Sequence, residues 1–420
     1  IYQCDWSSDV CSSDLHFHSD CASFAGCENM LANFFGSERL MSEYAVSFSY
    51  RQSAAYDAGL RRRVSRSFDV RPLPLKDVAE FNAATKKLPA WCGGLLRMAA
   101  RLLLLRYWFV LWNTLLLYRA IGRPDLLHIN NGNYPGAYSC MSAVFAARLR
   151  GVQRIVYVVN NIAIPYDSMR RRLDYPFDRV VARSVSLFIT ASRHAGAALQ
   201  TVLRLPPGRV ANIHNGIAPR TLTANREETL RRLGIAATRL LIGVVAVLEE
   251  RKGHQVLLEA LAQIKTHGGS AALPLIIIEG TGSCESALKD YVAARDLGDD
   301  VVFTGSAPDI FDFMNAMDAI ALPSIGQEDF PNVVIEAMSL GKPVLATRVA
   351  GIPEQVEDMA SGLLVEPRDA SALADAMRKL ADPVLRARLG DNARQRYTAC
   401  FTAETAVAAY ESIYQKLLQT

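Results

Sequence analysis

The sequence predicts an α/β protein with two doubly wound domains, each a parallel sheet between layers of helices. Its 420 residues allow two or three domains, at about 100–200 residues per domain. Short runs rich in β-branched residues alternate with segments of helical periodicity, which is typical of βαβ units. A charged segment, 215–239, separates two series of such units. Because doubly wound sheets bind ligands outside the carboxyl ends of their strands, we expect the two domains to face each other across a ligand cleft.

The expected strands are short apolar runs, several of them almost uninterrupted, as expected where helices cover both faces of a sheet. They are Tyr44–Tyr50, Leu126–Asn130, Ile155–Asn160, Leu187–Ala191, Arg209–His214, Leu240–Val247, Leu275–Glu279, Val301–Thr304, Ala319–Pro323 and Pro343–Thr347. We place one domain at 16–214, a second at 215–400 and a C-terminal segment at 401–420. The last helix, Thr402–Leu418, carries an apolar stripe and could cross back to the N-terminal domain.

The N-terminus requires separate treatment. Residues Asp5–Leu15 read DWSSDVCSSDL and show neither a helical nor a strand period. The string resembles a translated sequencing adapter, so we expect residues 1–15 to be non-native and the true first strand to be missing. A polar N-terminal tail is the alternative. His16 and His18 have no acidic or cysteine partners nearby in the sequence, and we expect them to be exposed to solvent.

Composition excludes several classes of protein. Hydrophobic residues make up 50% and charged residues 21%, which excludes a disordered or fibrous chain. The net charge of +4 is too small to indicate a nucleic-acid partner. Eight cysteines without a C-x-x-C pair fit a reducing, cytoplasmic compartment and argue against structural zinc. The sequence has no D-x-D or H-E-x-x-H motif, and we expect no bound metal.

One hydrophobic segment, Leu95–Leu117, suggests a transmembrane helix at first sight. A membrane span needs about 18 or more apolar residues, but Arg97, Arg101 and Arg106 interrupt this one. We expect a core helix, with a peripheral membrane contact as the alternative. We expect the arginine triplets Arg61–Arg63 and Arg170–Arg172 to be solvated faces. If they lay beside this helix, they would attract anionic lipid.

Two acidic residues stand out in the sequence GQEDFPNVVIEAMSLGKPV. Pro331 suits the first turn of a helix, which places Glu328 in the preceding loop and Glu336 inside the helix. Free amides at the helix start can hold an anion. Glu328 would then lie beside an anion site, and Glu336 could accept hydrogen bonds from sugar hydroxyls. Two solvated glutamates are the alternative, because the spacing of two acids is weak evidence alone.

Basic residues and glycines follow two strands of the same half. Arg251 and Lys252 precede a glycine at a predicted helix start, where a lysine can neutralise a diphosphate. An exposed basic pair is the alternative. Gly280 and Gly282 permit a tight strand-to-helix turn and close approach to a ligand. The third glycine of a dinucleotide motif is replaced by Glu285, which argues against an NAD-linked enzyme.

The order of these motifs is more specific than any one of them. Asn-Gly-Ile, Arg-Lys-Gly, Gly-x-Gly, Phe-Thr-Gly, the two glutamates, Gly-Ile-Pro-Glu and Gly-Leu-Leu-Val follow one another between 215 and 365. The sequence resembles the family-4 retaining glycosyltransferases of the GT-B fold, with two Rossmann-like domains. The resemblance covers residues 16–420 and is strongest over 209–380. It implies an acceptor-side N-terminal domain and a nucleotide-sugar-binding C-terminal domain.

The resemblance implies roles for individual residues. Glu328 would lie beside the donor sugar, Lys252 would bind the diphosphate and Glu336 the ribose. His128 and Asn130 are the candidates for catalytic residues in the N-terminal domain. The donor-binding residues would be Gly26, Arg251, Gly280, Gly282, Gly305, Phe330, Pro331, Asn332, Val333 and Glu336.

Two departures from the family pattern bear on activity. The family usually has an arginine where this chain has Val247, so either Arg251 substitutes for it or diphosphate binding is weaker. Members often have a functional histidine where this chain has Asn130, which could still hydrogen-bond substrate. His128 at a strand end is more often a packing residue than a catalyst.

The resemblance implies an enzyme that needs no cofactor and uses a UDP- or GDP-sugar as donor. Family tendency suggests a glycan or lipid-linked glycan acceptor, in the synthesis of surface or exported polysaccharide at the cytoplasmic face of the membrane. A phosphorylase or sugar-phosphate synthase of the same fold is one alternative. A non-catalytic nucleotide-sugar-binding protein is another.

Overall fold

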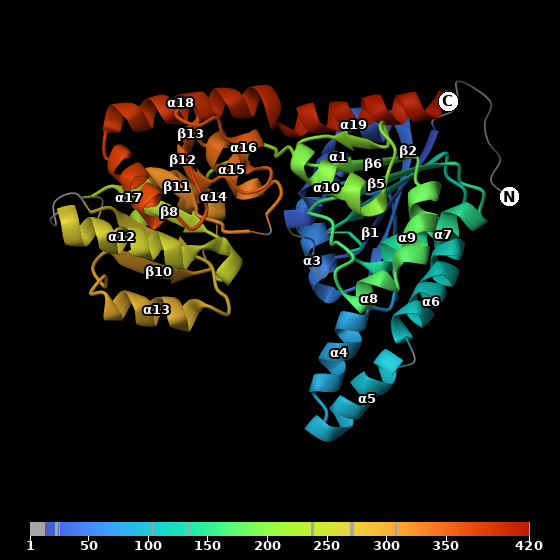
Figure 1. Cartoon of the computed structure of the whole chain (residues 1–420). Helices are drawn as coiled ribbons and strands as arrows, with labels where there is room; N and C mark the ends of the chain where they lie inside the picture. Colours follow the sequence, from blue (N-terminus) through green and yellow to red (C-terminus); the bar gives the residue numbers. More distant parts are fainter. Residues whose placement is uncertain are drawn as a thin grey trace. The chain divides into compact units, whose positions relative to one another are not determined.

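The computed structural model describes residues 13–21, 24, 26–102, 104–132, 134–236, 239–268, 273–306, 309–326 and 328–419. The chain divides into two compact units (Figure 1). Unit 1 comprises the chain up to Ile213 together with the segment from Val407 onward, and unit 2 comprises His214–Ala406. The division after residue 213 lies one residue from the boundary that the sequence predicts.

Within the described part of unit 1, seven parallel strands form a sheet of order β3-β2-β1-β4-β5-β6-β7. The strands are β1 Ser13–Ser19, β2 Tyr44–Arg51, β3 Asp69–Leu73, β4 Leu126–Asn131, β5 Arg154–Val159, β6 Leu187–Thr190 and β7 Val210–Asn212. The helices are η1 Gly26–Glu28, α1 Asn29–Gly36, α2 Glu38–Glu43, α3 Ala54–Arg63, α4 Val78–Lys86, α5 Ala90–Leu102, α6 Leu105–Ala120, α7 Tyr138–Leu149, α8 Met169–Arg172, α9 Tyr175–Ser184 and α10 Arg193–Leu203. Helices α4 and α5 project from the rest of the unit (Figure 1).

Within the described part of unit 2, six parallel strands have the order β10-β9-β8-β11-β12-β13. The strands are β8 Leu241–Val245, β9 Leu275–Glu279, β10 Val301–Gly305, β11 Ala319–Leu322, β12 Val344–Thr347 and β13 Gly362–Val365. The helices are α11 Arg226–Leu233, η2 Glu250–Lys252, α12 His254–Gly268, α13 Glu285–Ala294, α14 Ile310–Ala316, α15 Asn332–Ser339, α16 Ile352–Gln355, α17 Ala370–Lys379 and α18 Pro383–Cys400. The last helix, α19 Ala403–Leu418, is shared between the two units.

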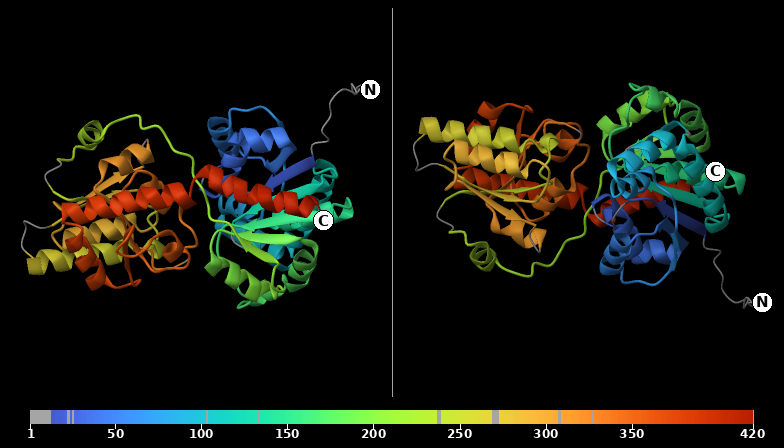
Figure 2. Two further views of the ribbon diagram at one scale, coloured as in Figure 1. Left: turned by 90° about the horizontal axis from the view of Figure 1, so that it is seen from above. Right: turned by 90° about the horizontal axis from the view of Figure 1, so that it is seen from below.

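Helix α19 begins in unit 2, and its residues from Val407 onward belong to unit 1. Seen from above, α18 lies over unit 2 and the later part of α19 lies over unit 1 (Figure 2). In unit 1 the ring of Tyr410 packs edge-on against Phe34 of α1, with ring centroids 5.0 Å apart. The predicted return of the C-terminal helix to the N-terminal domain is therefore present.

Local sequence explains where many helices begin. Ser192, Asn225 and Asp382 each precede a helix, and the side chain of each accepts a hydrogen bond from a backbone amide of the first turn. Such a cap contributes about 1 kcal/mol. Strands β4, β9 and β12 are buried along their whole length, which explains their largely apolar sequences.

The expectation that the first strand is missing is wrong. Ser13–Ser19 forms β1, which pairs with β2 on one side and β4 on the other. His16 and His18 are fully buried in β1 rather than exposed. The His16 ring lies 2.7 Å from Ser47 Oγ and 2.8 Å from Ser49 Oγ, and these hydroxyls replace the water that the sequence analysis expected around it. Of residues 1–15, which we expect to be non-native, 13–15 begin β1 and 1–12 lie outside the described residues.

The hydrophobic segment Leu95–Leu117 also differs from expectation. It forms parts of α5 and α6, which are separated near Leu104, a residue with φ of 50°. One side of this pair is exposed, not core. Its exposed side chains are Trp91, Leu95, Leu96, Met98, Leu104, Trp108, Leu111, Trp112, Leu115 and Tyr118. Among the helices described, none combines the length and hydropathy needed to cross a bilayer.

Candidate active-site residues

Loops at the carboxyl ends of the strands in unit 2 bring together residues from distant parts of the sequence. Strand β8 leads to η2, which carries Arg251 and Lys252, and β11 leads to the loop that carries Glu328. Because β8 and β11 are paired neighbours, their following loops leave the sheet side by side. Adjacent parallel strands end at one edge, which is where doubly wound sheets bind ligands.

Glu328 is a buried carboxylate with two cationic partners. It is only 6% exposed. Its Oε1 accepts hydrogen bonds from Lys252 Nζ, from Arg251 Nη1 at 3.2 Å and from Ser324 Oγ at 3.2 Å. A buried carboxylate requires such partners, because removing the charge from water is costly. The structure thus brings together Glu328, Lys252 and Arg251, and it adds Ser324, which the sequence analysis did not single out.

Gly253 explains how η2 approaches the loop after β11. Its φ is +69°, and a Cβ at this position would lie 1.9 Å from the carbonyl oxygen of Pro323. The amide of Ile325 donates to the Arg251 carbonyl at 2.8 Å. Only glycine fits this backbone contact without strain. Gly253 therefore positions Lys252 against Glu328, a role that the sequence analysis did not derive.

Gly280 and Gly282 also make close backbone contacts, but with the protein itself. A Cβ on Gly280 would lie 2.0 Å from the Ala246 carbonyl oxygen, and one on Gly282 would lie 2.4 Å from that of Leu248. The two glycines therefore pack the turn after β9 against the segment after β8. This contact supports the segment that leads to Lys252, whereas the prediction had the two glycines approach a ligand. Gly305 ends β10 with φ of +68°, and a Cβ there would meet open space.

The start of α15 is built largely as the sequence predicts. Pro331 is the residue just before the helix, with φ of −65°, the value its ring imposes. The Asn215 side chain donates to Asn332 Oδ1 at 3.2 Å and to the Phe330 carbonyl at 3.5 Å. Val333 lies in the first turn, where backbone amides lack partners within the helix. The Asn-Gly-Ile motif thus helps to hold the start of this helix.

Glu336 lies in α15 and is partly exposed.

The sequence analysis missed a contact between His214, at the start of unit 2, and Phe330. His214 stacks on Phe330 with ring centroids 4.8 Å apart, and its Nε2 lies 3.5 Å from Glu354. The Phe330 side chain therefore serves packing, which leaves only its backbone for the predicted contact with a donor. The single sign of this arrangement in the sequence is the Gly-Ile-Pro-Glu motif that supplies Glu354.

A cavity of about 400 Å³ lies beside Arg251 in unit 2. It is lined by Glu249, Glu250, Arg251, Ile325, Gly326 and Arg368. Val247, which stands where the family usually has an arginine, is 50% exposed. Arg251 thus lines the cavity and also contacts Glu328, which is the placement needed if it substitutes for the missing arginine.

The corresponding strand ends of unit 1 carry a buried hydrogen-bonded network. Asn130, at the end of β4, is 2% exposed. Its Nδ2 donates to Glu28 Oε2 at 2.7 Å, and its Oδ1 accepts from Asn160 at 2.8 Å. Ser19 donates to the other Glu28 oxygen at 2.7 Å. Burial raises the pKa of Glu28 to about 7. The amide of Asn130 is thus hydrogen-bonded within the protein, and its contact with substrate stays a prediction.

Gly26 and His128 differ in how they relate to this network. Gly26 begins η1, the short helix that carries Glu28, and is exposed. His128 is fully buried in β4, with its Nδ1 2.7 Å from the hydroxyl of Tyr414 in α19. Burial lowers its pKa to about 3. Its ring also packs on Phe17 with centroids 4.8 Å apart. His128 is a packing residue, and the prediction of a catalytic role is wrong.

No arrangement of three or more His, Cys, Asp or Glu side chains that could hold a metal ion occurs within the described ranges.

Two family models match consecutive parts of the chain. Residues 80–220 match the model for Glycosyltransferase Family 4, and residues 225–396 match that for Glycosyl transferases group 1. A D-inositol 3-phosphate glycosyltransferase of Corynebacterium jeikeium (strain K411) is 35% identical over 198 residues, which is 46% of this chain and 47% of the relative. The amylovoran biosynthesis glycosyltransferase AmsK of Erwinia amylovora is 36% identical over 144 residues, 33% of this chain and 35% of the relative. The chain spans about half the length of the first relatives it matches.

Solved structures share the fold. Anabaena Alr3699/HepE in complex with UDP has a TM-score of 0.74 at 20% identity, covering 96% of this chain and 100% of that one. WaaG, a glycosyltransferase involved in lipopolysaccharide biosynthesis, has a TM-score of 0.62 at 18% identity, covering 94% and 98%. Two parallel-sheet units and the paired family matches agree with one another. The chain has the GT-B fold, and its two parts are similar to Glycosyltransferase Family 4 and to Glycosyl transferases group 1.

Proposed function

We propose that the protein transfers a sugar from a nucleotide-sugar donor to an acceptor hydroxyl, with retention of the anomeric configuration and without a bound metal. The observation that carries this proposal is the cluster at the strand ends of unit 2. There the buried carboxylate of Glu328 pairs with Lys252 and Arg251, close in sequence to the start of α15. The cluster lies in the part of the chain that matches the group-1 model.

The chemistry follows from the charges. The bond between the anomeric carbon and the diphosphate oxygen breaks while the acceptor oxygen attacks the same face of the sugar. The departing phosphate oxygen takes the acceptor proton. Lys252 and the free amides of α15 stabilise the developing negative charge. Glu328 holds Lys252 in place and lies beside the sugar, and Glu336 binds the ribose. Catalysis is then largely positioning and charge stabilisation.

A UDP-sugar is the first donor to test, with a GDP-sugar as the alternative. The solved complexes of HepE with UDP and with UDP-glucose support this choice. The name of AmsK supports a glycan or lipid-linked glycan acceptor in polysaccharide synthesis. The exposed apolar side of α5 and α6 supports a peripheral membrane contact, because tryptophan and other apolar side chains on one helix face insert into the lipid interface.

The first experiment is a thermal-shift screen against UDP-, GDP- and ADP-sugars, because a ligand that binds only the folded state raises the melting temperature. A donor found in this way is then incubated with glycan acceptors and, separately, with inorganic phosphate. Glycosylated product supports the proposal. Release of sugar phosphate would show a phosphorylase or synthase instead, and binding without transfer or hydrolysis would show a non-catalytic binding protein.

A further inference from the structure

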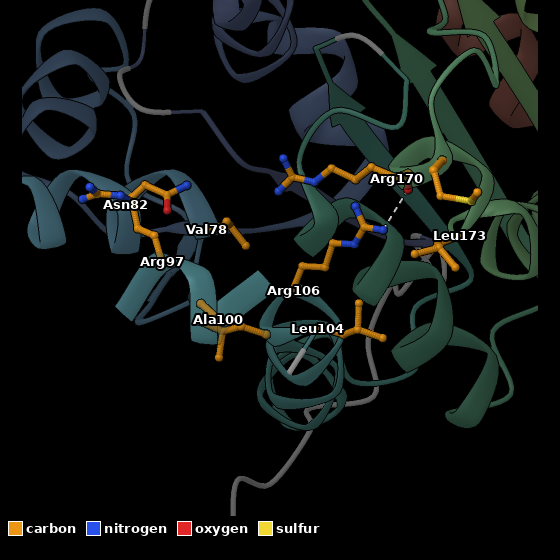
Figure 3. Close-up of a pocket in the computed structure, with 10 residues that line it drawn as sticks. Val78, Asn82, Arg97, Ala100, Leu104, Arg106, Arg170 and Leu173 are labelled. Atoms are coloured by element: carbon orange, nitrogen blue, oxygen red, sulfur yellow. Dashed lines mark hydrogen bonds between the residues drawn. The ribbon is translucent and has the colours of Figure 1, made fainter. Parts of the chain in front are cut away.

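A second cavity lies in unit 1, at the base of the projecting helices. Its volume is about 560 Å³. It is lined by Val78, Asn82, Arg97, Ala100, Leu104, Leu105, Arg106, Met169, Arg170 and Leu173. These residues come from α4, α5, α6 and α8 and the residues just beside them. Figure 3 shows Asn82 and Arg97 on one side of the cavity and Arg106, Arg170 and Leu173 on the other.

The polar part of this cavity is cationic. Three arginines line it, and none of the lining residues is acidic. Arg106 is 6% exposed. It donates to Tyr107 Oη at 2.7 Å and to the Arg170 carbonyl at 2.8 Å, and it lies 3.5 Å from Asp174. Its Nε is buried without a hydrogen-bond partner. The guanidinium of Arg106 thus has Asp174 as an anionic partner within the protein, and its charge lies at the cavity wall beside Arg97 and Arg170.

The other two arginines are less engaged within the protein. Arg97 is partly buried and donates to Thr85 Oγ1 at 3.3 Å. Arg170 is exposed at the cavity, and its guanidinium forms no ion pair with a carboxylate among the described residues. Arg97 and Arg170 can therefore both turn their donors toward a phosphate, which guanidinium groups bind through paired, charge-assisted hydrogen bonds.

The remaining walls are apolar, which a site for a free inorganic ion would not need. They are formed by Val78, Ala100, Leu104, Leu105, Met169 and Leu173. Met169 is 73% exposed, Leu173 45% and Leu104 43%. Leu104 also belongs to the exposed apolar side of α5 and α6, which carries Trp91, Trp108 and Trp112. A cationic cavity that opens onto an apolar surface with tryptophans is suited to a phosphate that carries a hydrocarbon chain.

The position of the cavity in the sheet favours an acceptor as the ligand. Helix α4 follows β3, and α8 follows β5, so both lie after carboxyl ends of strands. Glu28 lies in η1, which follows β1, and Asn130 is the last residue but one of β4 in the same parallel sheet. The two helices and these two residues thus lie toward the carboxyl ends of the strands, where this class of fold binds ligands.

We propose that this cavity binds the phosphate or diphosphate group of a lipid-linked acceptor, while its hydrocarbon chain lies in a membrane leaflet against the exposed side of α5 and α6. The assignment rests on the proposed function, because it specifies the acceptor of that transfer. Arg97 and Arg170 bind the phosphate oxygens, and buried Arg106 adds positive charge to the cavity wall. The apolar walls contact the first carbons of the chain.

The test compares a double variant, Arg97→Gln with Arg170→Gln, with a matched control, Arg119→Gln with Arg172→Gln. The control removes the same charge from α6 and α8 at positions that do not line the cavity. Buried Arg106 is left intact so that both proteins fold. Binding is measured by co-sedimentation with phosphatidylcholine vesicles that contain a polyprenyl phosphate, or phosphatidylglycerol at equal charge. Soluble inorganic diphosphate is added as a competitor in a separate arm.

We expect wild type and control to bind the polyprenyl-phosphate vesicles about tenfold or more tightly than the double variant, as the loss of charge-assisted hydrogen bonds implies. We also expect weaker binding to phosphatidylglycerol, and only partial competition by diphosphate. Equal binding by the double variant and the control would overturn the proposal. Equal binding to the two anionic lipids would also overturn it, since it would show a general attraction to anionic surfaces. Complete competition by diphosphate would assign the cavity to a soluble anion and overturn it too.

Thermal shift by the nucleotide sugar is measured on the same proteins, because the donor cluster lies in unit 2. If donor binding fails in wild type, the proposed function fails whatever the vesicles show. If donor binding is retained and the double variant binds lipid normally, only the cavity assignment fails.

Discussion

The strand ends of the two units hold a buried glutamate in opposite ways. In unit 2, Glu328 accepts from Lys252 and Arg251, so its charge is balanced by cations. In unit 1, Glu28 accepts from Ser19 and Asn130, and burial raises its pKa to about 7. The strand ends of unit 2 thus carry a charged cluster that suits a diphosphate. The strand ends of unit 1 carry a network of neutral donors around a carboxyl group whose pKa is raised to about 7, so that about half of it is protonated at neutral pH.

The largest expected effect concerns the charged cluster. Glu328→Ala should lower sugar transfer by about 10²–10³-fold, the cost of removing one preorganised electrostatic group. Affinity for UDP should stay the same or rise, because Lys252 and Arg251 lose a competing anion. Transfer is measured with the donor found in the thermal-shift screen, and UDP affinity by titration calorimetry. Glu285→Ala, which removes a partly exposed carboxylate paired with Lys289 on α13, is the control. Equal transfer by the Glu328 variant and this control would remove Glu328 from the site.

The next effect tests how unit 2 positions its lysine. Gly253→Ala places a Cβ 1.9 Å from the Pro323 carbonyl oxygen, which forces the backbone apart and should destabilise unit 2 by several kcal/mol. Gly305→Ala has nearly the same φ, +68°, but a Cβ there meets nothing within 4 Å. It should cost only about 1 kcal/mol. Urea denaturation measures the free energy of unfolding of both variants. An equal decrease in the two would show that the contact with Pro323 does not affect stability.

The stability of unit 1 should depend on pH because of Glu28. Glu28 has a raised pKa, so the unfolded chain releases this proton near pH 4.5 and the folded chain only near pH 7. The contribution to stability is therefore complete below pH 4.5 and is lost as pH rises toward 7. It amounts to roughly 3 kcal/mol at most. Glu28→Gln should remove this part of the pH dependence. Denaturation curves at pH 5 and pH 7 measure it, and an unchanged pH dependence would place the titration elsewhere.

A smaller effect comes from buried neutral histidines. Burial lowers the pKa of His16, and lowers the pKa of His18 to about 4 and of His128 to about 3, all in unit 1. In unit 2, the pKa of His254 is lowered to about 4. Because the unfolded state binds protons first, stability falls as pH drops below about 6.5. Each histidine should cost roughly 0.7 kcal/mol between pH 7 and pH 6. When the pH is lowered from 7 to 6, protection from hydrogen exchange should fall more in unit 1 than in unit 2. A larger fall in unit 2 would contradict this.

The sequence predicted unit 2 better than unit 1 for physical reasons. In unit 2 the relevant signals are local. Pro331 sets the start of α15 and thereby leaves Glu328 in a loop, and the glycine at 253 ends η2 directly after Lys252. Most strands there are continuous apolar runs. A local pattern of this kind can be recognised without knowing what packs against it.

In unit 1 the decisive contacts are non-local. The bond between Asn130 and Glu28 joins residues 102 positions apart, and His128 owes its burial to Tyr414 of the last helix. No spacing in the sequence indicates either contact. Strand β1 was missed because its first residues continue the polar composition before it. Its two histidines are kept neutral by burial and form hydrogen bonds with hydroxyls of the neighbouring strand. The exposure of α5 and α6 could not be predicted either, because an apolar helix gives the same pattern in a core.

The central claim, that the strand ends of unit 2 bind a nucleotide diphosphate through Lys252, is tested most directly by titrating UDP into wild type and Lys252→Ala. We expect the variant to bind UDP at least about tenfold more weakly, as the loss of one charge-assisted contact implies. It should remain folded with a lower melting temperature, because buried Glu328 keeps Arg251 and Ser324 but loses Lys252. UDP affinity equal to that of wild type in a folded Lys252→Ala protein would contradict the claim.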